Sequence, residues 1–303
     1  MDRVLSFRVF SRVAEMNSFT AAAASLGLPK ASASMAVKAL EQRLGARLFH
    51  RTTRRVELTQ DGHMFYARCR DLLSDIDETE TMFRTGEALS GRIRVDMPSR
   101  LARFQVIPRL PEFLAAHPGV ELELGSTDRL VDVVREGYDC VVRVGPLDDS
   151  GLVARRIGEL VLINCASPGY LARFGTPRGL RDLARHVVVH YAGVLGQRPA
   201  AWECAVRGEW QLTPVRGVVT VNNSEAYVAA CVAGLGLIQA PRAGLEADLS
   251  EGRLVEVLPR LRAQPLPISI LYPHRRHLPR RVRALMDWLC QVIQAPGASG
   301  ERA

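Results

Sequence analysis

The sequence lacks the paired motifs on which common metal, redox and catalytic sites are built. Its six cysteines include no Cys-x-x-Cys pair, which argues against a zinc site or a dithiol motif. A nucleophile elbow, a phosphate-cradling glycine loop and a pair of acid/base carboxylates at a usable spacing are also missing. We therefore expect no enzyme activity, no cofactor and no metal, and we interpret the cysteines as buried small hydrophobes.

Long apolar segments are lacking as well. The chain begins Met-Asp-Arg without an apolar signal region, and it holds no run of about 18 apolar residues. These absences predict a cytoplasmic protein with no membrane partner.

Positive charge is concentrated near the N-terminus. Residues 1–62 hold 10 basic side chains against 5 acidic ones, whereas residues 63–90 hold 3 against 6. Residues 91–303 are also basic, with 27 against 21, so the total charge alone decides nothing. The local surplus indicates where a polyanion such as DNA would bind.

Three helical patterns fill the basic segment. Ser18 or Thr20 can cap a second, alanine-rich helix, and Gly27 suits the end of that helix. Pro29 can open a third helix that runs to about Leu44. The first helix is predicted from apolar residues that share one helical face: Leu5, Val9, Phe10, Val13 and Ala14.

The third helix has two contrasting faces. Its core-facing stripe is predicted to be Ala33, Val37, Leu40 and Leu44. The opposite face carries short, polar or basic residues that can approach base edges and phosphates. These candidate DNA-binding residues are Lys30, Ala31, Ser32, Ser34, Met35 and Lys38. Taken alone, this pattern also fits an ordinary amphipathic surface helix.

A basic hairpin after this helix favours the DNA-binding interpretation. Residues 47–59 read as a wing in which arginines flank two threonines. Such side chains suit phosphate and minor-groove contacts, which hold a recognition helix in register. The candidate wing residues are Arg51, Thr52, Thr53, Arg54 and Arg55.

The N-terminal segment resembles a known family. The residues that carry the resemblance are Phe10, Ser18-Phe19-Thr20, Ala22-Ala23, Leu26, Ser34, Leu40-Glu41, Leu44-Gly45, Leu48-Phe49, Arg51-Thr52-Thr53-Arg54, Leu58-Thr59 and Gly62. Their pattern is similar to that of the LysR-type transcriptional regulators. The resemblance implies an α/β protein with a winged helix-turn-helix, a long dimerising linker helix and a two-lobed effector domain like a periplasmic binding protein. Lys30 and Met35 depart from the Gln and Arg of many relatives, so the operator sequence is not carried over.

A long helix is predicted over residues 62–86. Its seam, with spacings that alternate between three and four, is formed by Phe65, Cys69, Leu72, Ile76, Thr79 and Phe83. That alternation is typical of a coiled coil, and it predicts a homodimer or a dimer of dimers. The alternative is a single amphipathic helix packed on its own effector domain.

The remaining residues alternate short β-rich runs with helical ones, which predicts mostly parallel strands in an α/β domain. Helices are expected near residues 99–117, 128–136, 224–233 and 279–293. The predicted domains are 1–60 for DNA binding, 61–90 for the linker and 91–303 for the effector domain, with lobe 1 at about 91–160 and 270–295 and lobe 2 at about 165–265.

Candidate effector-binding residues lie where strands give way to helices, because ligands of α/β sheets bind at such points. They are Ser99, Arg100, Ser126, Thr127, Asn222 and Ser224, with Arg143, Tyr191 and Gln239 completing a polar lining. Hydroxyls at helix ends and an arginine suit a carboxylate, so an organic anion is the expected effector. Each hydroxyl is alternatively an ordinary N-cap, and Arg143 a salt-bridge partner of Asp128 or Asp139.

The sequence thus predicts a transcriptional regulator that senses a small anionic effector. Its expected partners are double-stranded promoter DNA, the effector, further copies of the chain and RNA polymerase. Two alternatives stay open: an architectural DNA-binding repressor that needs no effector, and a solute-binding or enzyme-like α/β domain that carries a DNA-binding head incidentally.

Overall fold

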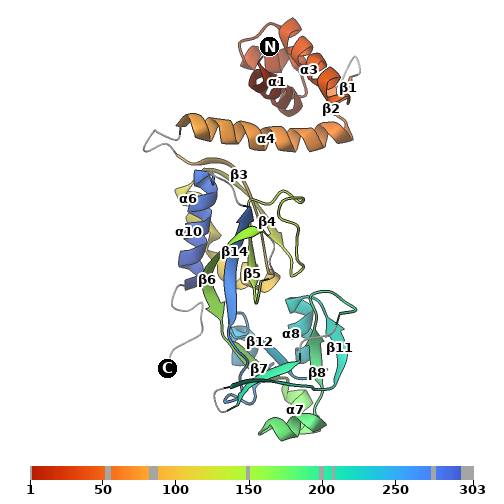
Figure 1. Cartoon of the computed structure of the whole chain (residues 1–303), viewed down its shortest axis with the longest axis vertical. Helices are drawn as coiled ribbons and strands as arrows, with labels where there is room; N and C mark the ends of the chain where they lie inside the picture. The colour runs from red at the N-terminus through yellow and green to blue at the C-terminus, as the bar shows by residue number, and fades with distance from the viewer. Residues whose placement is uncertain are drawn as a thin grey trace. The chain divides into compact units, whose positions relative to one another are not determined.

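The structure is a computed structural model with two compact units, residues 1–92 and 93–303 (Figure 1). Among the described residues, no helix combines the length and the apolar character needed to span a membrane. The structure describes residues 2–51, 56–81, 88–147, 151–197, 201–206, 209–273 and 278–294.

The N-terminal unit begins with three capped helices. The Asp2 side chain accepts the Val4 N–H at the start of the first, and the Ser18 side chain accepts the Ala21 N–H at the start of the second. Gly45 ends the third with a φ of 66°, a conformation that favours glycine. The elements are α1 (Arg3–Met16), α2 (Phe19–Ser25), α3 (Lys30–Leu44), β1 (Phe49–Arg51), β2 (Val56–Leu58) and α4 (Gln60–Thr81).

The core of this unit consists largely of small and aromatic side chains. Ala22, Ala23, Ala33 and Ala36 are buried, and their size lets the helices pack closely. The Phe10 ring lies 5.3 Å from the Phe49 ring and 5.2 Å from the Phe65 ring, measured between centroids. The predicted core stripe is confirmed except at Leu44, which is exposed.

Helix α4 departs from the predicted seam in its first half. Phe65 packs against the core of the N-terminal unit, and Cys69 is fully buried in it. These two positions are therefore turned toward the chain's own core, which the heptad pattern could not reveal. Leu72 is exposed, and Phe83 lies outside the described residues.

Lobe 1 of the C-terminal unit is built on a five-stranded sheet of order β4-β3-β5-β14-β6. Helix α10 packs beside β6 (Figure 1). The Phe113 ring of α6 contacts the Trp288 ring of α10. The elements are β3 (Ser90–Met97), α5 (Ser99–Leu101), η1 (Ala102–Val106), η2 (Ile107–Arg109), α6 (Leu110–Ala116), β4 (Gly119–Ser126), β5 (Cys140–Val144), β6 (Leu152–Leu160), β14 (Leu266–Pro273) and α10 (Arg280–Gln294).

Two predictions for lobe 1 need correction. The sheet is mixed, because β3 and β5 are parallel but β14 runs antiparallel to both β5 and β6. The expected helix at 99–117 is helical but irregular: α-helical, π-helical and 3₁₀ turns follow one another. Pro108 and Pro111 lie in it, and proline lacks the N–H that a regular helix needs.

The helix expected at 128–136 is absent, and the prediction was wrong. The Glu136 carboxylate accepts hydrogen bonds from the Arg129 guanidinium and from the Asp132 N–H, which folds the segment into a loop. Only a turn forms, over residues 133–137. Val133 is buried there, whereas Leu130 is 75 % and Val134 is 64 % exposed, so the apolar residues do not form one buried helical face.

Lobe 2 contains smaller sheets. Strands β12, β7 and β13 form an antiparallel sheet, β11 and β8 pair in parallel, and β9 and β10 form an antiparallel pair. The elements are β7 (Leu162–Ala166), α7 (Pro168–Phe174), η3 (Leu180–Arg185), β8 (Val188–Tyr191), β9 (Trp202–Val206), β10 (Glu209–Thr213), β11 (Gly217–Val221), α8 (Ser224–Val232), β12 (Ile238–Pro241), α9 (Glu246–Ser250) and β13 (Val255–Glu256).

The chain passes between the lobes twice. Val161 is the single residue between β6 of lobe 1 and β7 of lobe 2, and residues 257–265 lead from β13 back to β14. Leu160 and Leu266 are paired across the sheet just where the chain leaves and re-enters lobe 1. The lobes are therefore joined by two adjacent connections.

Candidate functional site

The exposed face of α3 collects the candidate DNA-binding residues of that helix. Lys30, Ala31 and Lys38 are exposed, and Met35 is 61 % exposed. Ser32 and Ser34 are partly exposed on the same stretch of helix. The face therefore offers two ammonium groups, two hydroxyls and one long apolar side chain, which can contact phosphates, base edges and thymine methyl groups.

Two side chains fix the position of α3 and the wing. The Glu41 carboxylate of α3 accepts the N–H groups of Leu48 and Phe49 at 2.9 and 3.2 Å, which ties the start of the wing to the helix. Thr59 donates its hydroxyl to the Arg47 carbonyl at 2.6 Å and accepts the Gly62 N–H at 2.9 Å. The helix, the wing and the first turn of α4 thus form one connected structure.

The wing itself is described only at its base. Arg51 ends β1, where it pairs with Val56 of β2. The candidate residues Thr52, Thr53, Arg54 and Arg55 lie outside the described residues. Gln42 and Arg43 are also exposed near the end of α3, and they were not among the predicted DNA-binding residues.

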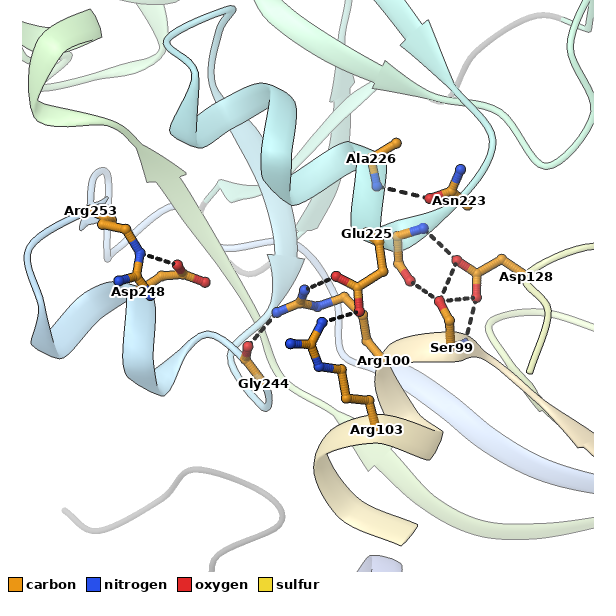
Figure 2. A network of polar contacts seen from close by, with 11 residues as sticks. Ser99, Arg100, Arg103, Asp128, Asn223, Glu225, Ala226, Gly244, Asp248 and Arg253 are labelled. Carbon is orange, nitrogen blue, oxygen red and sulfur yellow. Dashed lines mark hydrogen bonds and ion pairs between the residues drawn. The ribbon is translucent and has the colours of Figure 1, made fainter. Parts of the chain in front are cut away.

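In the C-terminal unit, two candidate effector residues from different lobes meet. The hydroxyl of Ser99, at the start of α5 in lobe 1, lies 3.1 Å from the hydroxyl of Ser224, at the start of α8 in lobe 2 (Figure 2). The Asp128 carboxylate accepts the Ser99 N–H at 2.9 Å, the Ser99 hydroxyl at 3.2 Å, and the Ser224 N–H. The place predicted for an anion thus holds an aspartate of the chain itself.

Arg100 strengthens the same contact between the lobes. Its guanidinium donates to the Glu225 carboxylate of α8 at 2.9 Å and to the Gly244 carbonyl (Figure 2). Arg103 reaches Glu225 at 3.4 Å. Asp128, Arg103, Glu225 and Gly244 were not among the predicted site residues. The signal for Asp128 was its place directly after Ser126-Thr127, where a capping residue is common.

The other predicted residues of the first lobe are placed differently. Arg143 is buried and donates to the Asp96 carboxylate at 2.7 Å and to the Val142 carbonyl. Thr127 donates its hydroxyl to the same carboxylate at 3.2 Å. Arg143 therefore completes a buried ion pair, whose partner is neither Asp128 nor Asp139. Ser126 ends β4 and is exposed.

Gln239 and Asn222 also lie away from the contact between the lobes. The Gln239 side chain accepts the Glu203 N–H and donates to the Glu203 carbonyl and to the Asn164 side chain, within lobe 2. Asn222 is exposed, and its neighbour Asn223 caps α8 by accepting the Ala226 N–H at 2.8 Å (Figure 2). The ordinary N-cap is therefore observed at position 223.

Tyr191 lies close to the contact. Its ring meets the Tyr227 ring at 5.6 Å between centroids. Burial raises the pKa of Tyr191 to about 12, and the negative charge of Asp128 acts in the same direction. The phenol is therefore protonated at neutral pH and available as a hydrogen-bond donor.

The six cysteines are buried and free. Burial raises the pKa of Cys69 and that of Cys165 to about 12. A protonated thiol is a poor nucleophile, so these positions do not favour redox sensing. Within the described ranges, His, Cys, Asp and Glu side chains nowhere gather into a group of three that could hold a metal ion.

Comparison with known proteins identifies both units. Residues 5–63 match the family described as "Bacterial regulatory helix-turn-helix protein, lysR family". Residues 86–294 match the family described as "LysR substrate binding domain". The chain is 46 % identical over 295 residues to an uncharacterized HTH-type transcriptional regulator of Escherichia coli, YhjC, covering 97 % of this chain and 99 % of the relative. An HTH-type transcriptional repressor of Pseudomonas aeruginosa is 35 % identical, with 97 % and 93 % coverage.

Solved structures agree with this assignment. CrgA, a LysR-type transcriptional regulator from Neisseria meningitidis, matches with a TM-score of 0.60 and 27 % identity over 97 % of this chain and 100 % of that one. The full-length Vibrio cholerae virulence activator AphB matches with a TM-score of 0.57 and 31 % identity over 95 % and 98 %. The chain belongs to the LysR family of transcriptional regulators, with an N-terminal helix-turn-helix domain and a C-terminal substrate-binding domain.

Proposed function

We propose that the chain reads promoter DNA with the exposed face of α3 and steadies itself on phosphates with the β1–β2 wing. The polar and basic face of α3, set opposite four buried core positions, is the single observation that supports this most strongly. Substitutions on the two surfaces have different consequences, because base contacts specify sequence whereas phosphate contacts only position the protein.

A gel-shift titration at several salt concentrations tests this division. Ser34→Ala should relax discrimination between the operator and unrelated DNA. Arg54→Ala should weaken binding to every sequence and lower the salt slope by about one unit. Arg173→Ala, which removes the same charge from an exposed position in lobe 2, is the matched control and should change neither. Identical behaviour of the Ser34 and Arg54 variants would refute the assignment.

We further propose that a small organic anion binds between the two lobes and changes how the protein engages DNA. The N–H groups and hydroxyls of Ser99 and Ser224, together with the nearby Tyr191, support an acidic effector. The protein would act in the cytoplasm as a homodimer or homotetramer. RNA polymerase would be its partner at the promoter. A ligand can shift the protein only as far as it binds one arrangement more tightly than another.

One observation favours a second candidate, an architectural repressor that needs no effector. The polar groups that would hold an anion are already paired with the chain's own Asp128 and Glu225. Thermal unfolding in the presence of single carboxylates, with benzoate, succinate and citrate among them, separates the two. Stabilisation by one carboxylate supports the sensor, because a ligand that binds the native state raises the unfolding temperature. No stabilisation by any of them supports the architectural repressor.

A further inference from the structure

Asp128 joins the two lobes through backbone groups that carry partial positive charge. It accepts the N–H of Ser99, the first residue of α5, and the N–H of Ser224, the first residue of α8 (Figure 2). The first N–H groups of a helix have no partner within the helix. In the nine-residue helix α8 the helix dipole also favours an anion at that end. One carboxylate from lobe 1 therefore serves a helix from each lobe.

The contact is more than the capping of a single helix. Helix α8 already has a cap, because the Asn223 side chain accepts the Ala226 N–H. Asp128 therefore satisfies a further N–H of α8, that of Ser224, from the other lobe. The surrounding contacts point the same way, since Arg100 of lobe 1 binds Glu225 and the Gly244 carbonyl of lobe 2.

The residues directly before and after Asp128 hold it in place. Thr127 donates its N–H to the Met97 carbonyl at 3.1 Å and its hydroxyl to the buried Asp96 carboxylate. On the other side, Arg129 forms two hydrogen bonds with Glu136, at 2.9 and 2.5 Å. The loop thus presents the Asp128 carboxylate at a fixed place on lobe 1.

We propose that Asp128 is a built-in anion that latches lobe 2 onto lobe 1, and that an acidic effector acts by taking the place of its carboxylate. The second part rests on the proposed sensing function, whereas the latch itself does not. Because both N–H groups donate to the same carboxylate, the effector and Asp128 compete for them. Binding of the effector would release the 127–137 loop while its own carboxylate keeps the helix starts satisfied.

Spin labels on the full-length protein measure the latch directly. Ala115 on α6 of lobe 1 and Ala172 on α7 of lobe 2 are exposed, and cysteines introduced there react selectively because the six native cysteines are buried. The distance distribution between the labels reports the separation of the lobes. Asp128→Ala should shift and broaden this distribution. Asp128→Asn, which keeps an acceptor oxygen but loses the charge, should produce a smaller change.

Asp287→Ala is the matched control. Asp287 forms an exposed ion pair with Arg155 at 2.8 Å, and both residues lie in lobe 1. Its removal should leave the distribution unchanged. An unchanged distribution in both Asp128 variants overturns the latch, and so does an equal change in the Asp287 variant.

Sodium acetate tests whether a free carboxylate can take the place of Asp128. In the Asp128→Ala protein, acetate should restore the wild-type distribution, whereas sodium chloride at the same ionic strength should not. Opening without restoration by acetate overturns the exchange of anions. Gel shifts on the same samples keep the two proposals apart. If the Asp128 variants open and close as expected but the wild-type protein binds no DNA, the proposed function is refuted and the latch stands.

Discussion

The side chain of Arg143 neutralises a carboxylate that is fully shielded from water. Asp96 is 0 % exposed and its carboxylate accepts from Arg143 at 2.7 Å. Removing one partner of such a pair leaves an uncompensated buried charge, which costs about 3–5 kcal/mol. We therefore expect Arg143→Met to lower the free energy of unfolding of the C-terminal unit by about that amount, measured by urea titration of the full chain.

Arg155→Met serves as the comparison for this prediction. Arg155 pairs with Asp287 at 2.8 Å, but their side chains are 46 % and 50 % exposed. Exposed pairs contribute about 0–1 kcal/mol, so this change should be nearly silent. Equal losses in the two variants would show that the buried pair has no special role.

The imidazole of His186 makes stability depend on pH. Burial lowers the pKa of His186 below its usual range, and its Nδ1 lies 3.1 Å from the Tyr170 hydroxyl. The folded protein therefore prefers the neutral ring. Its contribution is complete above the unfolded pKa of about 6.5 and is lost as the pH falls below that value.

We expect the unfolding temperature of the wild-type protein to fall more steeply between pH 7.5 and 5.5 than that of His186→Gln. Differential scanning calorimetry over this range measures the slopes. His50→Gln, a change at an exposed position of the wing, should keep the wild-type slope. Parallel profiles for the wild-type and His186→Gln proteins would contradict the prediction.

For single residues, the sequence predicted which side chains lie near each other better than it predicted their hydrogen-bond and ion-pair partners. Ser99 and Ser224 were both predicted for the effector site, and their hydroxyls lie 3.1 Å apart. The partner of Arg143 could not be predicted, because Asp96 is brought near by the parallel pairing of β3 with β5. Sequence spacing holds no information on that register.

Among the elements, the start of α4 depends on a glycine. A Cβ at Gly62 would lie 2.1 Å from the Leu48 carbonyl oxygen, so an alanine there must push the wing away from the helix. We expect Gly62→Ala to destabilise the N-terminal unit by about 1–3 kcal/mol and to weaken DNA binding. Urea unfolding and gel shifts measure the two effects.

Gly169→Ala is the control, since a Cβ at this position of α7 would meet nothing within 4 Å. It should leave both measurements unchanged. A wild-type affinity for DNA in the Gly62 variant would show that the wing tolerates displacement.

Elements whose signals are local were predicted well. Helix α3 begins within one residue of the predicted start and ends at the predicted Leu44, because proline and glycine mark its ends. The segment 128–136 has an equally apolar sequence, but its conformation is decided by the bonds of Asp128 and Glu136. The bond of Asp128 reaches Ser224, far away in the chain, and a local pattern does not reveal such a partner.

For the whole molecule, the exposed part of α4 is the expected contact between copies. Leu72 lies on the predicted seam and is 49 % exposed, whereas Met64 lies off the seam and is 62 % exposed. Leu72→Asp should shift the protein toward the monomer in sedimentation velocity, because it places a charge in an apolar interface. Met64→Asp changes the same helix and should leave the assembly intact; equal effects of the two would refute the seam.

The double connection between the lobes limits how they can move. Leu160 pairs with Leu266 on one side of Val161, and Leu162 pairs with Pro241 on the other. Val161 is itself held, because its carbonyl accepts the Arg242 N–H at 2.9 Å. The chain therefore has paired residues right up to the crossing between the lobes, which lets the lobes rotate more readily than slide. A change in the angle between the lobes would then reach the rest of the regulator mainly as rotation about this crossing.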